Sequence, residues 1–248
     1  MAYDGTAYAG FQIQPNAPTV QGELERVLAA MCGEPVRVTG AGRTDAGVHA
    51  SGQVMDFRTT SGLGTMELER GVNALLPGDI AISGLEPAED SFHARFSATG
   101  RTYEYRIRNA AVRDPLWTRR EHWHPGDLDL AVMRAAAAQL VGRHDFAAFA
   151  AGESGERTVK RAEWISEGSV LRFEIESDAF LRGMVRGIVG TLLWVGRGKM
   201  TVERFGDVLA ARDRTLAGPS APASGLCLVA VRYGDGERRR QDGSENWE

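Results

Sequence analysis

A glycine-rich loop in the first quarter of the chain carries the side chains best suited to chemistry. In GAGRTDAGVHA, which spans residues 40–50, the glycines let the backbone turn tightly and approach a ligand closely. Arg43 precedes Asp45 by two residues, and its guanidinium could contact a phosphate while keeping the Asp45 carboxylate ionised. A carboxylate flanked in this way is suited to display at the floor of a cleft. Loop aspartates also commonly close Asx turns, and the loop taken by itself favours that second interpretation.

Patterns typical of other enzyme classes are absent from the sequence or incomplete. The loop matches neither a P-loop nor a dinucleotide-binding fingerprint, and no GxSxG elbow occurs. His122 and His124 alternate on one face of a predicted strand and could bind a metal, but no HExxH motif or cysteine pair adds ligands. Cys32 and Cys227 form no CxxC pair, which favours a reducing, cytoplasmic setting. We therefore expect no metal and no small-molecule cofactor.

Arginine dominates the basic residues, although the net charge of the chain is −4. Of the 29 Lys and Arg residues two are lysines, and seven arginines against two acidic residues fall between Arg95 and Arg120. The planar guanidinium donates two parallel hydrogen bonds and therefore suits phosphate recognition. A GC-rich genome would also replace lysine by arginine, and this explanation stays open for the bias of the whole chain. It explains the local cluster less well, which favours a nucleic-acid partner.

A strand with one basic face is predicted over Thr102–Arg108. Tyr103, Tyr105 and Ile107 alternate there with polar and charged residues, which is the period of a strand. Aromatic rings among arginines fit RNA, because rings stack on unpaired bases while guanidiniums hold the backbone. Both tyrosines fall on one face of the strand, so either could instead belong to the core.

A strongly apolar helix is predicted over Phe180–Val195. Arg182 and Arg186 lie four residues apart and would share one face of this helix. An arginine in so apolar a helix needs a buried acid or a phosphate as its partner. Alternatively, its aliphatic stem could lie along the helix edge with the charged head in water.

The elements around these segments predict an α+β fold in two halves. Residues 1–108 follow the order β-α-β-β-α-β of a ferredoxin-like unit. Residues 109–233 again interleave strands with helices, and the polar, charged tail 234–248 is predicted to be disordered. We expect a helix between Thr19 and Gly33 from its capping residues. We also expect one strand over Val48–Phe57.

The composition, with 43% hydrophobic and 25% charged residues, is that of an ordinary soluble globular protein. No run of eighteen apolar residues occurs, so a membrane span is not expected. The first residues also lack the basic and apolar regions of a secretion signal.

Eight stretches spanning nearly the whole chain resemble the tRNA pseudouridine synthase A family, in the order found in that family. They are YDGTAYAGFQIQP, TVQGELE, GAGRTDAGVHA, NALLPGDI, SFHARFSATGRTYEYRI, GRHDFAAF, FLRGMVRGIVGTL and LAGPSAPASGLCLVAVRY. The resemblance implies two ferredoxin-like halves with largely antiparallel sheets that face a central RNA-binding, catalytic cleft. Two departures from the family are visible: Phe11 stands where members commonly have Trp, and only Met1 and Ala2 precede the YDG motif. A truncated first strand or a misassigned start codon would explain the second departure.

The resemblance assigns roles to particular residues. Asp45 matches the catalytic aspartate, which overturns the turn-only interpretation of the loop. Tyr103 matches the tyrosine that packs against the target uracil, and Arg186 matches the arginine that pairs with the catalytic carboxylate. Arg43 matches an arginine that helps to hold the flipped nucleotide. Leu226 falls where the family has an apolar residue near the site.

The activity implied by the resemblance is isomerisation of uridine to pseudouridine at positions 38, 39 and 40 of the tRNA anticodon arm. The reaction involves no net redox change and no water, so it implies no cofactor. The expected partners are tRNA and a second copy of the chain in a homodimer. Two rival functions are a catalytically idle RNA-binding protein and a carboxylate-based glycosidase. The glycosidase would need a second carboxylate, and none stands in an obvious role within the matched motifs.

Overall fold

The computed structural model describes residues 1–234 and 236–237, which form two compact units. The first unit contains Met1–Thr99 together with the described residues from Leu228 onward, and the second contains Gly100–Cys227. The boundary predicted between residues 108 and 109 lies near the end of a long strand, and it stays a prediction about independently folding halves. The predicted disorder of the tail concerns residues that lie mostly outside the described ones.

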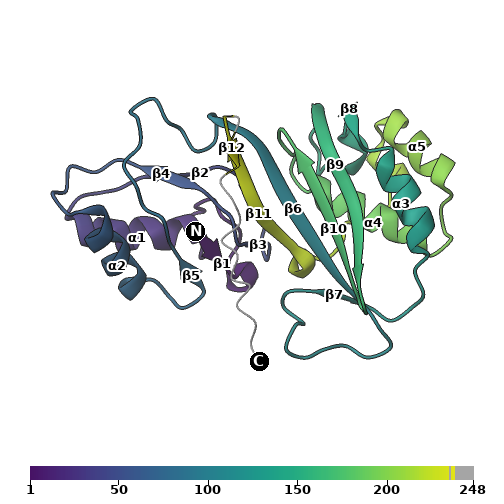
Figure 1. Ribbon diagram of the computed structural model, residues 1–248, viewed down its shortest axis with the longest axis horizontal. Coiled ribbons are helices and arrows are strands. Elements are labelled where there is room, and N and C mark those ends of the chain that lie inside the picture. Colours follow the sequence, from purple (N-terminus) through teal and green to yellow (C-terminus); the bar gives the residue numbers. More distant parts are fainter. Residues whose placement is uncertain (235, 238–248) are drawn as a thin grey trace. The chain divides into compact units, whose positions relative to one another are not determined.

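The first unit contains one four-strand path and a separate two-stranded sheet (Figure 1). Along the path the strand order is β5-β1-β3-β11, and β12 pairs with β11. The strands of the path are β1 (Ala2–Tyr3), β3 (His49–Ala50), β5 (Ile80–Ala81) and β11 (Leu226–Tyr233), and β12 covers Gly236–Glu237. The pairing of Tyr3 with Ala50 and with Ile80 is antiparallel. In the second sheet β2 (Val38–Gly40) and β4 (Met55–Phe57) are antiparallel as well.

The helices of the first unit are α1 (Val20–Cys32) and α2 (Thr65–Leu75), which pack against each other. The boundaries of α1 confirm the prediction from its caps. The Thr19 hydroxyl accepts a hydrogen bond from the Gly22 amide, and Gly33 takes the left-handed conformation that ends the helix. A short 3₁₀ helix, η1 (Gly5–Ala7), follows β1.

The second unit is built on an antiparallel sheet in the order β6-β10-β9-β8. Its strands are β6 (Ala98–Asn109), β8 (Gly142–Asp145), β9 (Glu156–Glu167) and β10 (Val170–Ser177), with β7 (His122–His124) parallel to β6. The helices α3 (Leu130–Ala138), α4 (Met184–Gly196) and α5 (Val202–Ala211) pack together, and they cover one face of the sheet (Figure 1). Short 3₁₀ helices occur at η2 (Ala147–Phe149), η3 (Arg214–Leu216) and η4 (Ala223–Gly225).

Helices and largely antiparallel strands thus occur in both units, which confirms the α+β class. Two local predictions were wrong. Residues 48–57 form the two short strands β3 and β4 in different sheets, not one strand. The apolar helix α4 begins at Met184, because Gly183 before it has φ 71°, so Arg182 lies outside the helix that carries Arg186. In the part of the chain that the structure describes, no helix is long and apolar enough to cross a membrane.

Candidate active site

The loop that carries Asp45 connects β2 to β3 in the first unit. Asp45 is half-buried and Arg43 is exposed, while Thr44 between them is buried. The Val48 amide donates to the Asp45 carbonyl oxygen at 3.1 Å, which closes a tight turn through Gly47 at φ 77°. The loop therefore contains a turn, as expected if Asp45 were only a turn residue. Arg43, two residues before Asp45, is exposed at the surface.

Side chains from other parts of the first unit hold this loop. The buried amide of Gln53 donates to the Gly42 carbonyl oxygen at 2.7 Å and accepts from the Gly42 amide at 3.2 Å. The Tyr3 hydroxyl lies 2.8 Å from the Thr44 hydroxyl oxygen, within hydrogen-bond distance. The Phe11 amide donates to the Thr44 carbonyl oxygen at 3.0 Å. Asp45 is thus preceded by two residues whose backbone is fixed from outside the loop.

A close backbone approach also fixes the loop. Gly10 has φ 105°, and a Cβ atom there would lie 2.7 Å from the Thr44 carbonyl oxygen. Because real Cβ contacts do not come so near, a larger residue at Gly10 would push the loop away. The Gly10–Phe11 segment therefore lies directly against the residue before Asp45.

Tyr103 lies on β6 in the second unit, opposite Ile175 of β10. Its side chain is buried, and its ring meets the Phe180 ring edge-on with centroids 5.1 Å apart. Tyr105, two residues further on, is fully buried and its hydroxyl donates to the Pro222 carbonyl oxygen at 2.8 Å. Burial raises the pKa of the Tyr105 phenol above its ordinary value, and the positive charge of Arg186 opposes this shift. Of the two tyrosines, Tyr105 is therefore the one that belongs more clearly to the core.

Arg186 lies in the first turn of α4 and is half-buried. Its Nε donates to the Ala221 carbonyl oxygen at 2.8 Å, and the Ala221 amide donates back to the Arg186 carbonyl oxygen at 2.9 Å. An arginine in this apolar helix was expected to need a polar partner. The Ala221 carbonyl oxygen is one such partner of the Arg186 guanidinium. Leu226 is buried at the start of β11, directly after η4.

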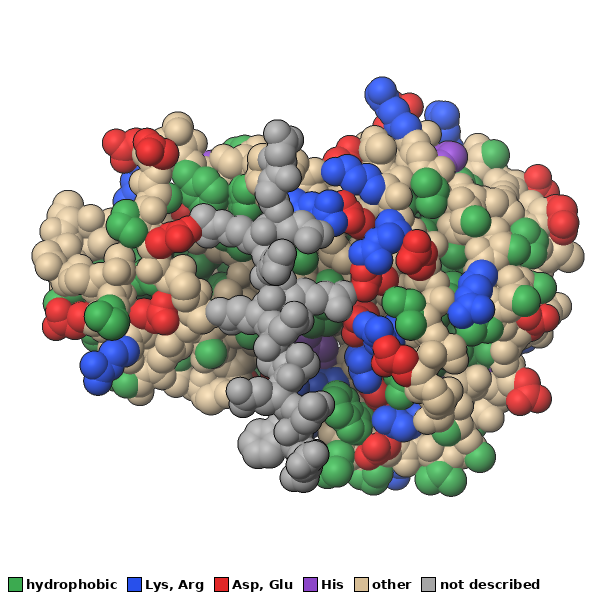
Figure 2. Space-filling model, in the orientation of Figure 1, with side chains coloured by type: hydrophobic (Ala, Val, Ile, Leu, Met, Phe, Trp, Pro, Cys, Tyr) green, Lys and Arg blue, Asp and Glu red, His purple; other side chains and the backbone are tan. Residues whose placement is uncertain are grey.

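The basic face of β6 is paired with carboxylates. Arg108 Nε lies 2.7 Å from Glu121, Arg106 lies 3.3 Å from the same carboxylate, and Arg172 of β10 lies 2.7 Å from Glu104. Figure 2 shows basic and acidic side chains interspersed over the second unit. Because Arg106 and Arg108 already have carboxylate partners, exposed arginines such as Arg43 are better placed to meet phosphate.

The two histidines of β7 lie on one face, as their alternation predicted, with ring centroids 6.3 Å apart. Burial lowers the pKa of His122, and the neighbouring His124 lowers it further. Among the described residues, no three His, Cys, Asp or Glu side chains form a cluster that could hold a metal ion.

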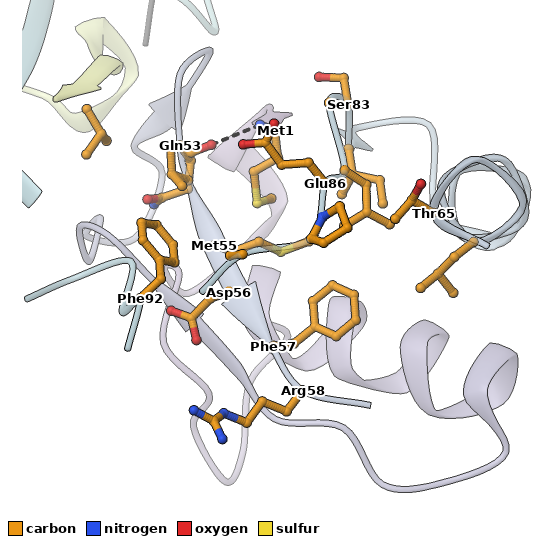
Figure 3. Close-up of a pocket in the computed structure, with 18 of the residues that line it drawn as sticks. Met1, Gln53, Met55, Asp56, Phe57, Arg58, Thr65, Ser83, Glu86 and Phe92 are labelled. Atoms are coloured by element: carbon orange, nitrogen blue, oxygen red, sulfur yellow. Dashed lines mark hydrogen bonds between the residues drawn. The ribbon is translucent and has the colours of Figure 1, made fainter. Parts of the chain in front are cut away.

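A cavity of about 960 Å³ opens in the first unit (Figure 3). Its walls come from Ser51–Thr59 and from Ile82–Asp90, and the Met1 amino group donates to the Gln53 carbonyl oxygen at its edge, at 2.9 Å. Burial lowers the pKa of this amino group. Neither Asp45 nor Arg43 lines the cavity, so the predicted site residues do not form it.

The five predicted site residues are divided between the units, with Asp45 and Arg43 in the first and Tyr103, Arg186 and Leu226 in the second. The sequence did not identify Gln53, which holds the Asp45 loop, or the buried Thr191, whose hydroxyl accepts from the Gly218 amide at 3.0 Å. A signal was available for both, because a lone amide or hydroxyl inside an apolar stretch needs a hydrogen-bond partner when buried.

Comparison with known proteins identifies the class of this chain. The profile of the tRNA pseudouridine synthase family matches residues 1–97 and 136–234. The chain therefore belongs to the tRNA pseudouridine synthase family. A tRNA pseudouridine synthase A from Chloroflexus aurantiacus is 50% identical over 244 residues, which cover 95% of this chain and 88% of the relative. Proteins of the same name from Geobacillus kaustophilus and Geobacter sulfurreducens are 46% and 44% identical, and the alignments cover 93% and 97% of those relatives.

Proposed function

We propose that this chain converts uridine to pseudouridine at positions 38, 39 and 40 of the tRNA anticodon stem and loop. Its membership in the tRNA pseudouridine synthase family supports the reaction and the substrate. The structural observation that carries the proposal is the fixed loop around Asp45, in which Gln53 and Tyr3 hold the residues on its N-terminal side. A catalytic carboxylate needs such a preorganised backbone, because small displacements of a reacting group reduce the rate steeply.

The reaction breaks the bond between the ribose anomeric carbon and N1 of uracil, turns the base, and joins C5 to the ribose. Asp45 acts in its ionised form, either by attacking the anomeric carbon or by initiating elimination to a glycal. The bond between the ribose anomeric carbon and N1 breaks, C5 of the turned base then bonds to that carbon, the C5 proton is lost, and N1 takes up a proton. Atoms of the substrate are conserved except for the exchanged proton, so the scheme uses no cofactor.

Arg186 and Asp45 would act as a pair. A guanidinium beside the carboxylate favours its ionised form and orients it. The hydrogen bond from Nε to the Ala221 carbonyl oxygen fixes one side of the guanidinium.

Tyr103, Arg43 and Leu226 would hold the target nucleotide. The base must leave the helical stack, at a cost of about a few kcal/mol. The exposed Arg43 would fill the vacated space and contact phosphate, while the Tyr103 ring packs against the free uracil and Leu226 supplies an apolar wall. The Tyr103 hydroxyl would also accept the C5 proton as a general base.

Tritium release from tRNA made with [5-³H]uridine tests the activity directly. The wild-type chain should release tritium and Asp45→Asn should not, while the mutant keeps its tRNA affinity. Asp207→Asn is a matched control, because Asp207 lies on the exposed surface of α5 beside Arg204. Turnover by Asp45→Asn would remove Asp45 from the mechanism. A wild type that binds tRNA without release would be an RNA-binding protein, and free uracil would indicate a glycosidase.

Two further experiments test the finer parts of the proposal. Replacing uridines 38, 39 and 40 by cytidine should abolish release, and residual release would place the target elsewhere. Tyr103→Phe should keep tRNA binding but lose turnover, because its ring can still pack and its hydroxyl is gone. Unchanged turnover would remove the hydroxyl from proton transfer.

The proposal places the enzyme in the cytoplasm as a homodimer in which one tRNA contacts both subunits. The arginine cluster between Arg95 and Arg120 would line the shared tRNA surface through its exposed members, such as Arg113 and Arg119, since Arg106 and Arg108 are paired with Glu121. Light scattering should give twice the chain mass at working concentration, and a monomer there would contradict the dimer.

A further inference from the structure

The segment Ala217–Pro222, called the strap below, lies directly on the backbone of α4. A Cβ atom on Gly190 would lie 1.7 Å from the Pro219 carbonyl oxygen, and one on Gly218 would lie 2.8 Å from the Gly190 carbonyl oxygen. Such distances are impossible for real Cβ atoms. Glycine on both sides is therefore what lets the strap approach the helix.

Two buried hydroxyl groups hold the strap near its ends. Thr191 of α4 is fully buried, and its hydroxyl accepts from the Gly218 amide at 3.0 Å while it donates to the Gly187 carbonyl oxygen at 2.8 Å. At the other end, the Tyr105 hydroxyl donates to the Pro222 carbonyl oxygen at 2.8 Å. Each hydroxyl forms a hydrogen bond with a backbone atom of the strap. Each therefore fixes the backbone of the strap directly.

Arg186 meets the strap between these two points. Its Nε donates to the Ala221 carbonyl oxygen, and the Ala221 amide donates to the Arg186 carbonyl oxygen. The two bonds tie both the backbone and the guanidinium of Arg186 to one residue. The direction of the guanidinium therefore depends on where the strap places Ala221.

We propose that Thr191 and Tyr105 are positioning residues that set the Arg186 guanidinium through the strap. The inference rests on the proposed function, in which Arg186 orients the Asp45 carboxylate. Neither residue needs to touch the substrate, because each acts through Ala221. Loss of either hydroxyl should therefore reduce the rate of the chemical step and leave tRNA binding unchanged.

The test compares Thr191→Val, Thr191→Ser and Tyr105→Phe in the tritium-release assay. Valine has the shape of threonine without its hydroxyl, so Thr191→Val should lower kcat about tenfold to hundredfold, with KM for tRNA unchanged, by the usual effect of displacing a catalytic group. Thr191→Ser keeps the hydroxyl and should restore kcat. Tyr105→Phe should resemble Thr191→Val.

Tyr233→Phe is the matched control for Tyr105→Phe, because the Tyr233 hydroxyl also donates to a backbone carbonyl, that of Ala94 at 2.6 Å, away from the strap. It should leave kcat unchanged. A structural readout is independent of activity: the Arg186 Nε–H proton, observed by NMR after ¹⁵N-arginine labelling, should exchange slowly in the wild type and faster in Thr191→Val.

The outcomes separate this inference from the proposed function. If the wild type releases no tritium, the proposed function fails and the inference fails with it. If the wild type is active, then wild-type kcat and slow Nε–H exchange in Thr191→Val would overturn the inference alone. Equal losses of kcat in Tyr105→Phe and Tyr233→Phe would also overturn it, because a general loss of stability would then explain both.

Discussion

Replacement of Gln53 by methionine should weaken the loop that carries Asp45. Methionine has nearly the shape of glutamine, so the change removes hydrogen bonds with little change in packing. It would leave the carbonyl oxygen and the amide of Gly42 without the partners they now have at 2.7 and 3.2 Å. The effect of this side chain on stability can therefore be worked out mainly from these two bonds, because its third bond, to the Tyr3 hydroxyl, is long at 3.4 Å.

Each buried polar group that loses its partner costs about 1–3 kcal/mol. Gly42 is half-buried, so water would reach it in part and the lower end of that range applies to each group. The free energy of unfolding should therefore fall by about 2 kcal/mol. For a chain of this size that corresponds to a fall in Tm of about 4–8 °C. The release of the backbone three residues before Asp45 should also lower kcat by about tenfold to hundredfold.

Thermal unfolding followed by circular dichroism and tritium release at 25 °C measure the two effects. Gln21→Met is the matched control, because the Gln21 amide also bonds to backbone atoms, those of Ile13 and Val38, but not to the Asp45 loop. The control should lose a similar amount of stability and keep its kcat. If Gln53→Met unfolds at the wild-type temperature, the bonds to Gly42 do not hold the loop. An equal loss of kcat in Gln21→Met would show that the rate follows overall stability and not loop geometry.

Two further predictions concern a glycine packed against the backbone and the dependence of stability on pH. Gly190→Ala should destabilise the chain by about 1–3 kcal/mol or more, because its Cβ would meet a carbonyl oxygen at 1.7 Å, whereas Gly62→Ala, with nothing within 4 Å, should be nearly neutral in urea unfolding. Hydrogen bonds from the hydroxyl groups of Thr59 and Thr60 hold the pKa of the Glu34 carboxyl at about 2, below the value of 4.5 expected in the unfolded chain. This contribution is present above pH 4.5 and is lost as the pH falls towards 2, so Glu34→Gln should flatten the fall of stability with pH in that range. A variant with the wild-type pH profile would show that Glu34 does not contribute.

The sequence predicted best what local interactions decide. The helix α1 begins and ends where its caps predicted, because the Thr19 hydroxyl and the left-handed Gly33 act within one turn. The strand expected over residues 48–57 divides because its two ends pair with partners far away in the sequence, and no local pattern records that pairing. Arg182 was placed on α4 because hydrophobic periodicity continues through Gly183, whose positive φ interrupts the helix.

In the candidate site, too, the residues of local motifs could be predicted from the sequence, whereas partners distant in the sequence could not. Asp45, Arg43 and Tyr103 were visible from residue types and motif resemblance. The partners of the loop were not, because Tyr3 and Gln53 reach it from 41 and 11 residues away. A spacing rule cannot identify such partners until the chain has folded.

Gln53, Thr191 and Tyr105, which hold the segments next to Asp45 and Arg186, share one physical feature: each forms a hydrogen bond with a backbone atom. The Gln53 amide bonds to the backbone of Gly42, and the Thr191 hydroxyl bonds to the backbone of Gly218. Substitution of such a residue therefore shifts a functional group without changing its charge or its chemical identity. A variant of such a positioning residue should reduce kcat without abolishing turnover, and it should leave tRNA binding unchanged. Asp45→Asn, by contrast, removes the reacting group itself and should abolish turnover, so the residual kcat distinguishes a loss of chemistry from a loss of placement.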